Sequence, residues 1–284
     1  MLELVQSLND IIWSPALIYL CLGAGIFFSI ITRFVQLRHF KEMWRLLLSG
    51  KSSAQGISSF QALAVSLSGR VGTGNIAGVA AAIGFGGPGA VFWMWVVAFF
   101  GAATAYIEST NAQIYKEEHD GLYRGGPAYY IEKALGQKWY AWIFAIATVI
   151  ACGVLLPTVQ SNSIGNAVEM AFGAGTMIDT GIGQISSAKI YTASFIVLLL
   201  GFIIFGGVKR IANFTQVVVP FMALAYIIIA FVVIALHIDK LPGVFMMIIN
   251  DAFSPMAGVG AAIGWGVKRG VYSNEAGQGT GPHA

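Results

Sequence analysis

The residues best suited to chemistry lie in one short run, positions 68–76 (SGRVGTGNI), inside a segment otherwise apolar enough to cross a bilayer. Glycine costs a helix interior about 1 kcal/mol relative to alanine, and an arginine in hydrocarbon is costly as well. We therefore expect the helix to be broken here, so that backbone polar groups face a substrate or an ion. The N–H groups that start the second half-helix suit a carboxylate. The candidate substrate-binding residues of this run are Gly72, Thr73, Gly74 and Asn75.

The same run offers oxygen atoms to a cation. Carbonyl groups at the end of the first half-helix suit Na⁺, a hard cation that prefers oxygen ligands. The candidate Na⁺ ligands are Gly69, Gly72 and Asn75. The alternative is that the small residues serve close packing between helices, but Arg70 and Asn75 favour the functional interpretation.

A second run of the same character occupies positions 268–279 (KRGVYSNEAGQG). It lies five spans later, in a span of opposite direction, and paired interruptions of opposite direction are what an inverted repeat predicts. The alternative is that Lys268 and Arg269 begin a cytoplasmic tail. Between the two runs, Gln160 lies in a long apolar span, where a buried amide needs a partner. We expect Gln160 to face either a cavity or a neighbouring helix.

Membrane helices must position these residues. The 284-residue chain is 57% hydrophobic and only 10% charged, whereas soluble domains are about 25% charged. Spans of membrane-crossing length are expected at 14–32, 56–84, 90–113, 139–168, 190–208, 211–238 and from about 255. The span 56–84 would be about 43 Å long as one helix, which again indicates an interruption, and the span 139–168 is expected to be long or bent at Pro157. The sequence predicts an all-α polytopic membrane protein with a single transmembrane domain, 1–284.

Basic residues predict the orientation of these spans. Eleven Lys and Arg residues fall in 33–51, 116–138 and 209–210, whereas the opposite loops hold only Lys189 and Lys240. The positive-inside rule therefore predicts an outside N-terminus and cytoplasmic basic loops in the cell membrane. The segment 33–51 also carries apolar residues at helical spacing, so we expect it to lie along the membrane surface. The net charge of +3 comes from these short loops, so it does not indicate a nucleic-acid partner.

The sequence shows none of the signatures of enzymes. It has no Ser/His/Asp grouping, no HExxH, no phosphate loop and no Cys/His metal spacing. Cys21 and Cys152 lie within apolar spans, so we expect packed thiols. Glu108 is expected to pair with Arg70 or to lie at the water boundary, in a structural role. We expect no enzymatic activity and no cofactor, with Na⁺ acting only as a coupling ion.

Longer motifs carry a family resemblance. Positions 86–95 (GGPGAVFWMW), continuing through 99–101 (FFG), resemble the signature of the alanine or glycine:cation symporter family, the sodium:alanine symporters. Positions 72–76 (GTGNI), 125–130 (GGPAYY) and 269–277 (RGVYSNEAG) resemble other hallmark stretches of that family, in the same order. The resemblance covers essentially the whole chain.

The resemblance implies a leucine-transporter-type fold of two five-helix inverted repeats with one additional helix. The additional helix would be 14–32, the first repeat 56–238, and the incomplete start of the second repeat 255–284. Family members are longer than this chain, so about the last four helices are expected to be missing. The eighth core helix, which holds a sodium ion in related folds, would be among them.

The resemblance also implies a function, which is Na⁺-coupled symport of a small neutral amino acid, alanine or glycine, across the lipid bilayer into the cell. The break at 72–75 would form one half of the amino-acid site and bind its carboxylate. Ser273, Asn274 and Gly277 would form the other half, with groups around Ser273 taking the ammonium, and Gln160 would line the same pocket. The alternatives are H⁺ coupling, a channel, and a truncated product that does not transport.

Overall fold

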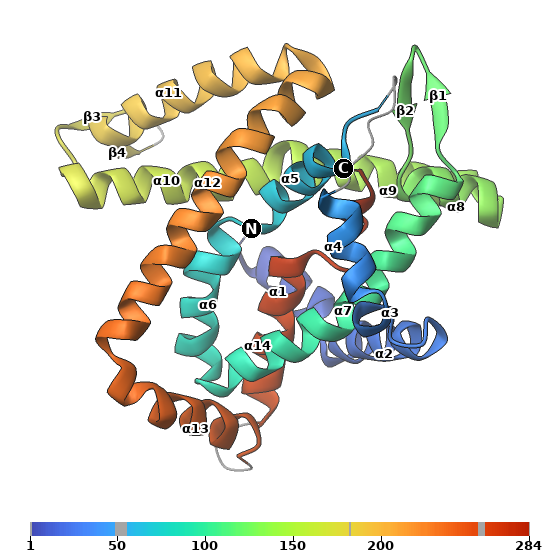
Figure 1. The fold of residues 1–284 in the computed structure, drawn as a ribbon. Coiled ribbons are helices and arrows are strands. Elements are labelled where there is room, and N and C mark those ends of the chain that lie inside the picture. Colours follow the sequence, from blue (N-terminus) through green and yellow to red (C-terminus); the bar gives the residue numbers. More distant parts are fainter. Residues whose placement is uncertain (1, 49–55, 182, 255–258, 284) are drawn as a thin grey trace.

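The computed structural model describes residues 2–48, 56–181, 183–254 and 259–283, and most of them are helical (Figure 1). The expected start of the last span near 255 and the end of the basic segment, 49–51, lie outside the described residues. In chain order the elements are α1 (Leu2–Ile12), α2 (Pro15–Ile31), α3 (Val35–Arg38), α4 (Phe40–Leu48), α5 (Ser59–Arg70), α6 (Thr73–Gly86), α7 (Gly89–Ile114), β1 (Glu117–His119), β2 (Leu122–Arg124), α8 (Pro127–Leu135), α9 (Lys138–Ile150), a π-helical turn (Ala151–Leu155), α10 (Leu156–Phe172), β3 (Met177–Asp179), β4 (Gln184–Ser186), α11 (Ser187–Ile204), α12 (Gly207–Leu236), a 3₁₀ turn (Ile238–Lys240), α13 (Leu241–Ala252), α14 (Val259–Asn274) and a last 3₁₀ turn (Gly281–His283).

Five helical segments of the described chain are long and apolar enough to cross a membrane. They are Asn9–Ile31, Gly89–Ile114, Lys138–Phe172, Ser187–Ile204 and Gly207–Leu236, and they match five of the expected spans. The remaining two expected spans are those with predicted interruptions. There α5 has 12 residues, α6 has 14 and α14 has 16. A half-helix of 12 to 14 residues reaches only about 18–21 Å, so α5 and α6 must act together to cross a bilayer.

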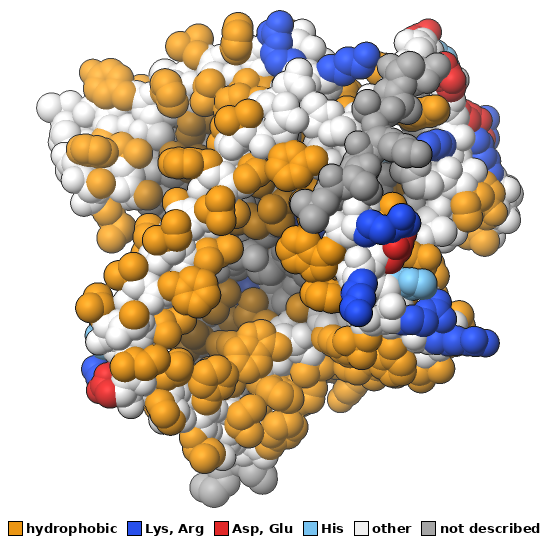
Figure 2. Space-filling view, in the orientation of Figure 1, with side chains coloured by type: hydrophobic (Ala, Val, Ile, Leu, Met, Phe, Trp, Pro, Cys, Tyr) orange, Lys and Arg blue, Asp and Glu red, His pale blue; other side chains and the backbone are white. Residues whose placement is uncertain are grey.

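The outer faces of these helices are apolar. On α11, Tyr191, Phe195, Leu198 and Phe202 are 66–74% exposed and recur at helical spacing. Hydrophobic side chains cover most of the face shown in Figure 2, while several lysines and arginines gather around α3 and α4. Such a large apolar surface is unfavourable in water and is expected of helices that face lipid. The chain is therefore a multi-pass membrane protein.

The expected break in the second span is confirmed. α5 ends at Arg70, and α6 begins at Thr73. Val71 (φ −104°, ψ 92°) and Gly72 (φ −155°, ψ −153°) are both extended between the two half-helices. In a continuous helix the Thr73 N–H would bond the carbonyl of Gly69, but it donates instead to the side chain of Gln160.

α14 runs beside α6 in the opposite direction and packs closely along α7 (Figure 1). Glycine allows the close contact between α14 and α7, because a Cβ at Gly266 would lie only 2.6 Å from the carbonyl oxygen of Ala90. Small residues allow this approach between membrane helices. A buried apolar cluster of Val97, Val267 and Val271 fills the same contact.

The fourth span changes its helical pattern just before Pro157. A π-helical turn, Ala151–Leu155, separates α9 from α10, and Pro157 lies in the first turn of α10. Proline lacks an N–H and its ring clashes with the carbonyl four residues earlier, and a π-turn accommodates such a disturbance. The expected irregularity in this span is therefore present, as a π-helical turn of five residues on the N-terminal side of Pro157.

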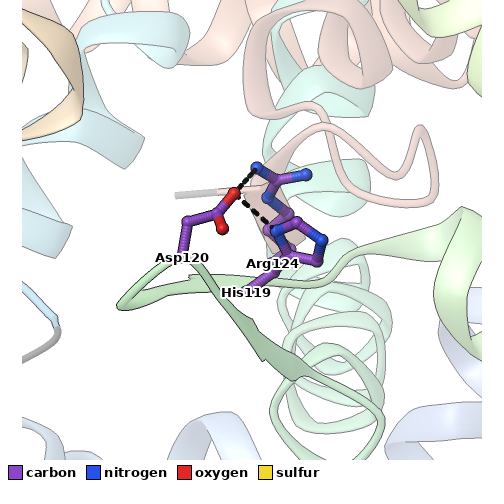
Figure 3. A network of polar contacts seen from close by, with 3 residues as sticks. All are labelled: His119, Asp120 and Arg124. Atoms are coloured by element: carbon purple, nitrogen blue, oxygen red, sulfur yellow. Dashed lines mark hydrogen bonds and ion pairs between the residues drawn. The ribbon is translucent and has the colours of Figure 1, made fainter.

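The polar connection expected at 116–138 has structure of its own. β1 and β2 form an antiparallel hairpin with His119 opposite Leu122. Asp120 and Gly121 both have positive φ, 54° and 71°, as a tight two-residue turn requires. The Asp120 carboxylate lies 2.7 Å from Nδ1 of His119 and 3.5 Å from Nη2 of Arg124 (Figure 3). These groups are exposed, so the pairs contribute little stability.

The residues that carry the family resemblance tie α7 to α13. The Gly89 N–H donates to the Asp251 carboxylate at 2.7 Å, and the Trp93 indole N–H donates to the Ala252 carbonyl at 3.1 Å. The first bond satisfies an N–H at the start of α7 that has no partner within the helix. The motif at 86–95 thus fixes the turn between α6 and α7 against the last residues of α13.

Candidate substrate and ion site

A cavity of about 380 Å³ lies at the break between α5 and α6. α10, α12 and α14 contribute its other walls. Five residues predicted from sequence line it: Gly69, Gly72, Gly74, Asn75 and Gln160. The volume falls in the range of small-molecule sites, about 300–1,000 Å³. The structure therefore brings together the first break and Gln160 around a space of suitable size.

Gln160 contacts the break directly. Its Oε1 accepts the Thr73 N–H at 3.3 Å. A Cβ added at Gly72 would lie 2.9 Å from Nε2 of Gln160, so the side chain approaches this backbone only because residue 72 has no Cβ. Any residue can adopt the extended backbone conformation of Gly72. Glycine is required here because a larger residue would clash with Gln160.

The predicted residues Thr73 and Ser273 lie away from this cavity. Thr73 lines a smaller cavity of about 180 Å³. Ser273 is close to α6, since its Oγ would lie 3.4 Å from a Cβ at Gly74. Neither hydroxyl has a hydrogen-bond partner among the described residues, although both atoms are buried.

The second predicted break begins where α14 ends at Asn274. Glu275 has φ 55°, a left-handed conformation that is uncommon outside glycine, and Gly277 and Gly279 also have positive φ. Asn274 is turned toward the backbone, where its Oδ1 accepts the Ala276 N–H at 2.9 Å. Helical geometry thus stops one residue after the predicted site residue Ser273.

Glu108 on α7 holds this second break. Its Oε2 accepts the Gly277 N–H and its Oε1 accepts the Gly279 N–H, each at 2.9 Å. The pairing with Arg70 expected from the sequence is not among the ion pairs of the described chain, and the two backbone N–H groups take the carboxylate instead. Gly277 itself lines a separate cavity of about 410 Å³, together with Glu108. The structure therefore places Asn274 and Gly277 outside the 380 Å³ cavity.

Six residues from the two runs line the 380 Å³ cavity without having been predicted as ligands: Ser68, Arg70, Val71, Tyr272, Glu275 and Gln278. The Glu275 carboxylate accepts the Thr280 hydroxyl at 2.7 Å and would lie 3.4 Å from a Cβ at Gly69. Arg70 and Glu275 form no ion pair within the described part of the chain. The cavity therefore presents one cationic and one anionic side chain, which suits a zwitterion.

The oxygen atoms that could hold Na⁺ come from the backbone and from amides. Within the described ranges no cluster of His, Cys, Asp and Glu side chains has the form of a metal site. The predicted ligands Gly69, Gly72 and Asn75 all line the cavity. The Gly72 carbonyl already accepts the N–H groups of Asn75 and Ile76, at 3.1 and 3.3 Å. The Gly69 carbonyl has lost its helical donor, because the Thr73 N–H bonds Gln160 instead. Gly69 is therefore better placed than Gly72 to bind a cation.

Comparison with known proteins decides the family. The family model described as the sodium:alanine symporter family matches residues 1–284. The chain belongs to this family. The resemblance drawn from the motifs is thereby confirmed.

Curated relatives cover the chain throughout. It is 58% identical over 287 residues to the "Putative sodium/proton-dependent alanine carrier protein YrbD" of Bacillus subtilis, which aligns with 100% of the chain and 57% of the relative. It is 45% identical to the "Probable sodium/glutamine symporter GlnT" of Bacillus subtilis, over 99% of the chain and 58% of the relative. It is 41% identical to the "Sodium/alanine symporter AgcS" of Methanococcus maripaludis, over 99% of the chain and 62% of the relative. The chain thus spans about three fifths of the length of these relatives.

Proposed function

We propose that the full-length protein is a secondary active transporter that couples Na⁺ entry to uptake of a small neutral amino acid, alanine or glycine. The observation that carries the proposal is the meeting of one interrupted helix with the end of another. The break between α5 and α6 and the end of α14 line one cavity of about 380 Å³, in a chain of the sodium:alanine symporter family. Broken helices that expose backbone groups at membrane depth are the usual means of binding in secondary transporters.

The proposed architecture is a leucine-transporter-type inverted repeat. The segment 56–238 would be the first repeat, 255–284 the start of the second, and 14–32 an additional helix. The antiparallel course of α6 and α14 supports this arrangement (Figure 1), because inverted repeats place corresponding broken helices side by side with opposite directions.

The amino acid would lie with its two charged ends toward different helices. The start of α6 carries the positive end of a helix dipole, so the carboxylate would lie near Gly74 and Asn75. The ammonium would lie near the Glu275 carboxylate, and Ser273 behind it is the predicted further acceptor. Leu156, Val218 and Met222 give the cavity an apolar wall, which suits a small uncharged side chain.

Na⁺ is the proposed coupling ion, bound near the end of α5 by carbonyl oxygens around Gly69. Its charge would order the backbone of the break, and the ordered backbone would then bind substrate, which couples the two affinities. H⁺ is the alternative coupling ion. H⁺ coupling is favoured by the position of the ionisable Glu275, which lines the cavity. It is also consistent with the name of one relative, which is called sodium/proton-dependent.

The proposed location is the cell membrane, with the N-terminus outside and the basic loops in the cytoplasm. The basic residues Arg38, Lys41 and Arg45 lie on the short helices α3 and α4, beside exposed apolar residues such as Leu37 and Trp44. A helix with both kinds of side chain is suited to the cytoplasmic surface of a bilayer.

Uptake by liposomes that contain the purified full-length protein tests the proposal. We expect radiolabelled alanine to accumulate above its external concentration when an inward Na⁺ gradient is imposed, and to equilibrate when K⁺ replaces Na⁺. Accumulation driven by a pH gradient without Na⁺, and abolished by a protonophore, would transfer the coupling to H⁺. Uptake that never exceeds the external concentration under either gradient would exclude symport and leave a channel or a protein that does not transport.

A further inference from the structure

A second, smaller cavity lies on the α6 side of the first break. It has a volume of about 180 Å³ and is bounded by one face of α6, by α10 and by α14. Tyr272 and Gly74 line both this cavity and the larger one. The Tyr272 ring would lie 2.9 Å from a Cβ at Gly74, so ring and backbone are in close contact. Together they form a thin wall between the two spaces.

The smaller cavity is rich in hydrogen-bond donors. Arg269, Thr73 and Ser163 line it together with small and apolar residues. Among the described residues, none of those that line it is Asp or Glu. The first turn of α6, a helix of 14 residues, also starts here at Thr73. A cationic side chain, two hydroxyls and a helix N-terminus favour an anion.

Two of these donors are buried without a partner. The Nε of Arg269 and the Oγ1 of Thr73 have no hydrogen-bond partner in the described part of the chain. The Arg269 guanidinium contacts the face of Trp265 at 5.6 Å and makes no ion pair with any described carboxylate. Arg269 as a whole is half-buried, and an arginine at membrane depth without a counter-charge is costly and typical of substrate pathways.

We propose that Arg269 and Thr73 form a second carboxylate-binding subsite, which holds the substrate before it passes the wall of Tyr272 and Gly74 into the larger cavity. The inference rests on the proposed amino-acid transport. The guanidinium binds the carboxylate by charge-assisted hydrogen bonds, and the Thr73 hydroxyl donates one more. The subsite lies on the α6 side of the break, which the distribution of basic residues predicts to face outward.

Matched variants of the full-length protein in liposomes test the subsite. Arg269→Gln should raise the KM for external alanine about tenfold or more, as expected when a charged hydrogen bond is lost, with kcat changed less than twofold. Arg269→Lys should restore part of the affinity. Lys268→Gln is the control, since its ammonium lies over Trp13 and Trp265 and outside the cavity. External propionate, a carboxylate without an ammonium, should inhibit wild-type uptake and fail to inhibit Arg269→Gln.

Binding of propionate to the purified protein gives a readout that does not depend on transport. Trp265 emission should change on titration with propionate, because the ring lies beside Arg269, and Trp265→Phe should remove the change. If wild type binds propionate but transports no alanine, the proposed function fails and the subsite stands.

Three results would overturn the subsite. One is an Arg269→Gln variant that folds, as judged by a single symmetrical size-exclusion peak, and keeps the wild-type KM and propionate sensitivity. Such a result would show that Arg269 does not bind the carboxylate of the substrate. Another is loss of wild-type uptake on replacing external chloride by methanesulfonate, which has no carboxylate, with no response to propionate, which would make the occupant an inorganic anion. The last is an equal rise in the KM for alanine in Lys268→Gln and in Arg269→Gln.

Discussion

Glu108→Gln should weaken substrate binding by removing one of two bonds that hold the second break. In wild type each carboxylate oxygen accepts one backbone N–H, from Gly277 and from Gly279, both at 2.9 Å. Glutamine keeps one oxygen and replaces the other by an amino group, which cannot accept. One N–H therefore loses a charged partner, at a cost of about 1.5–3 kcal/mol.

That free energy should appear in the affinity for alanine. Where the ordered break is the form that binds, destabilising it by 1.5–3 kcal/mol lowers the affinity by up to about 10- to 150-fold. Isothermal titration of alanine into the detergent-purified full-length protein measures the Kd, and a thermal melt shows any part of the loss that falls on stability instead. Glu132→Gln, on an exposed position of α8, is the matched control and should change neither quantity.

A clear result can refute this reasoning. If Glu108→Gln binds alanine with the wild-type Kd and melts at the wild-type temperature, the two bonds do not support the site. If the variant loses stability but keeps its Kd, Glu108 supports the fold alone. Glu108→Asp, which is shorter by one methylene, should fall between wild type and Glu108→Gln if reach to both N–H groups matters.

Other substitutions test the first break and its surroundings. Gly72→Ala should lower uptake at least tenfold, because the new Cβ would lie 2.9 Å from Nε2 of Gln160, whereas Gly84→Ala, with open space around it, should retain uptake. Asn75→Ala should weaken alanine or Na⁺ binding about tenfold, the effect expected for one polar ligand, and leave the size-exclusion profile unchanged. Asp251→Ala should lower the melting temperature through a loss of about 1.5–3 kcal/mol, because the first N–H of α7 loses a charged partner. Wild-type melting of that variant would show that water replaces the carboxylate.

The first break could be predicted because its cause is local. Glycines and polar groups make a continuous helix unfavourable at positions 68–76, whatever packs around them, and the structure ends α5 and starts α6 within that run. The other five spans were predictable for the same reason, since a long apolar run is itself the signal. The hairpin of β1 and β2 was missed, because its strands are exposed and show no alternation of apolar residues.

The second half of the site could be predicted only as a region. The sequence indicated residues 273–277 but could not say which of them face the cavity. That depends on where α14 ends and on the left-handed conformation of Glu275, which turns Gly277 toward Glu108. The hydrogen-bond partners of Glu108 could not be predicted either, because Glu108 and Gly277 are 169 residues apart in the sequence. Only the packing of α14 along α7 brings them together.

The two breaks share a physical solution. Each leaves backbone N–H groups without helical partners, and each receives a side-chain oxygen from a neighbouring helix. Gln160 of α10 accepts the Thr73 N–H, and Glu108 of α7 accepts those of Gly277 and Gly279. A shift of α10 relative to α6 would therefore free the Thr73 N–H, and a shift of α7 relative to the end of α14 would free those of Gly277 and Gly279. Because a ligand can favour only the state that it binds more tightly, the proposed substrate and ion would stabilise whichever of these helix arrangements binds them better.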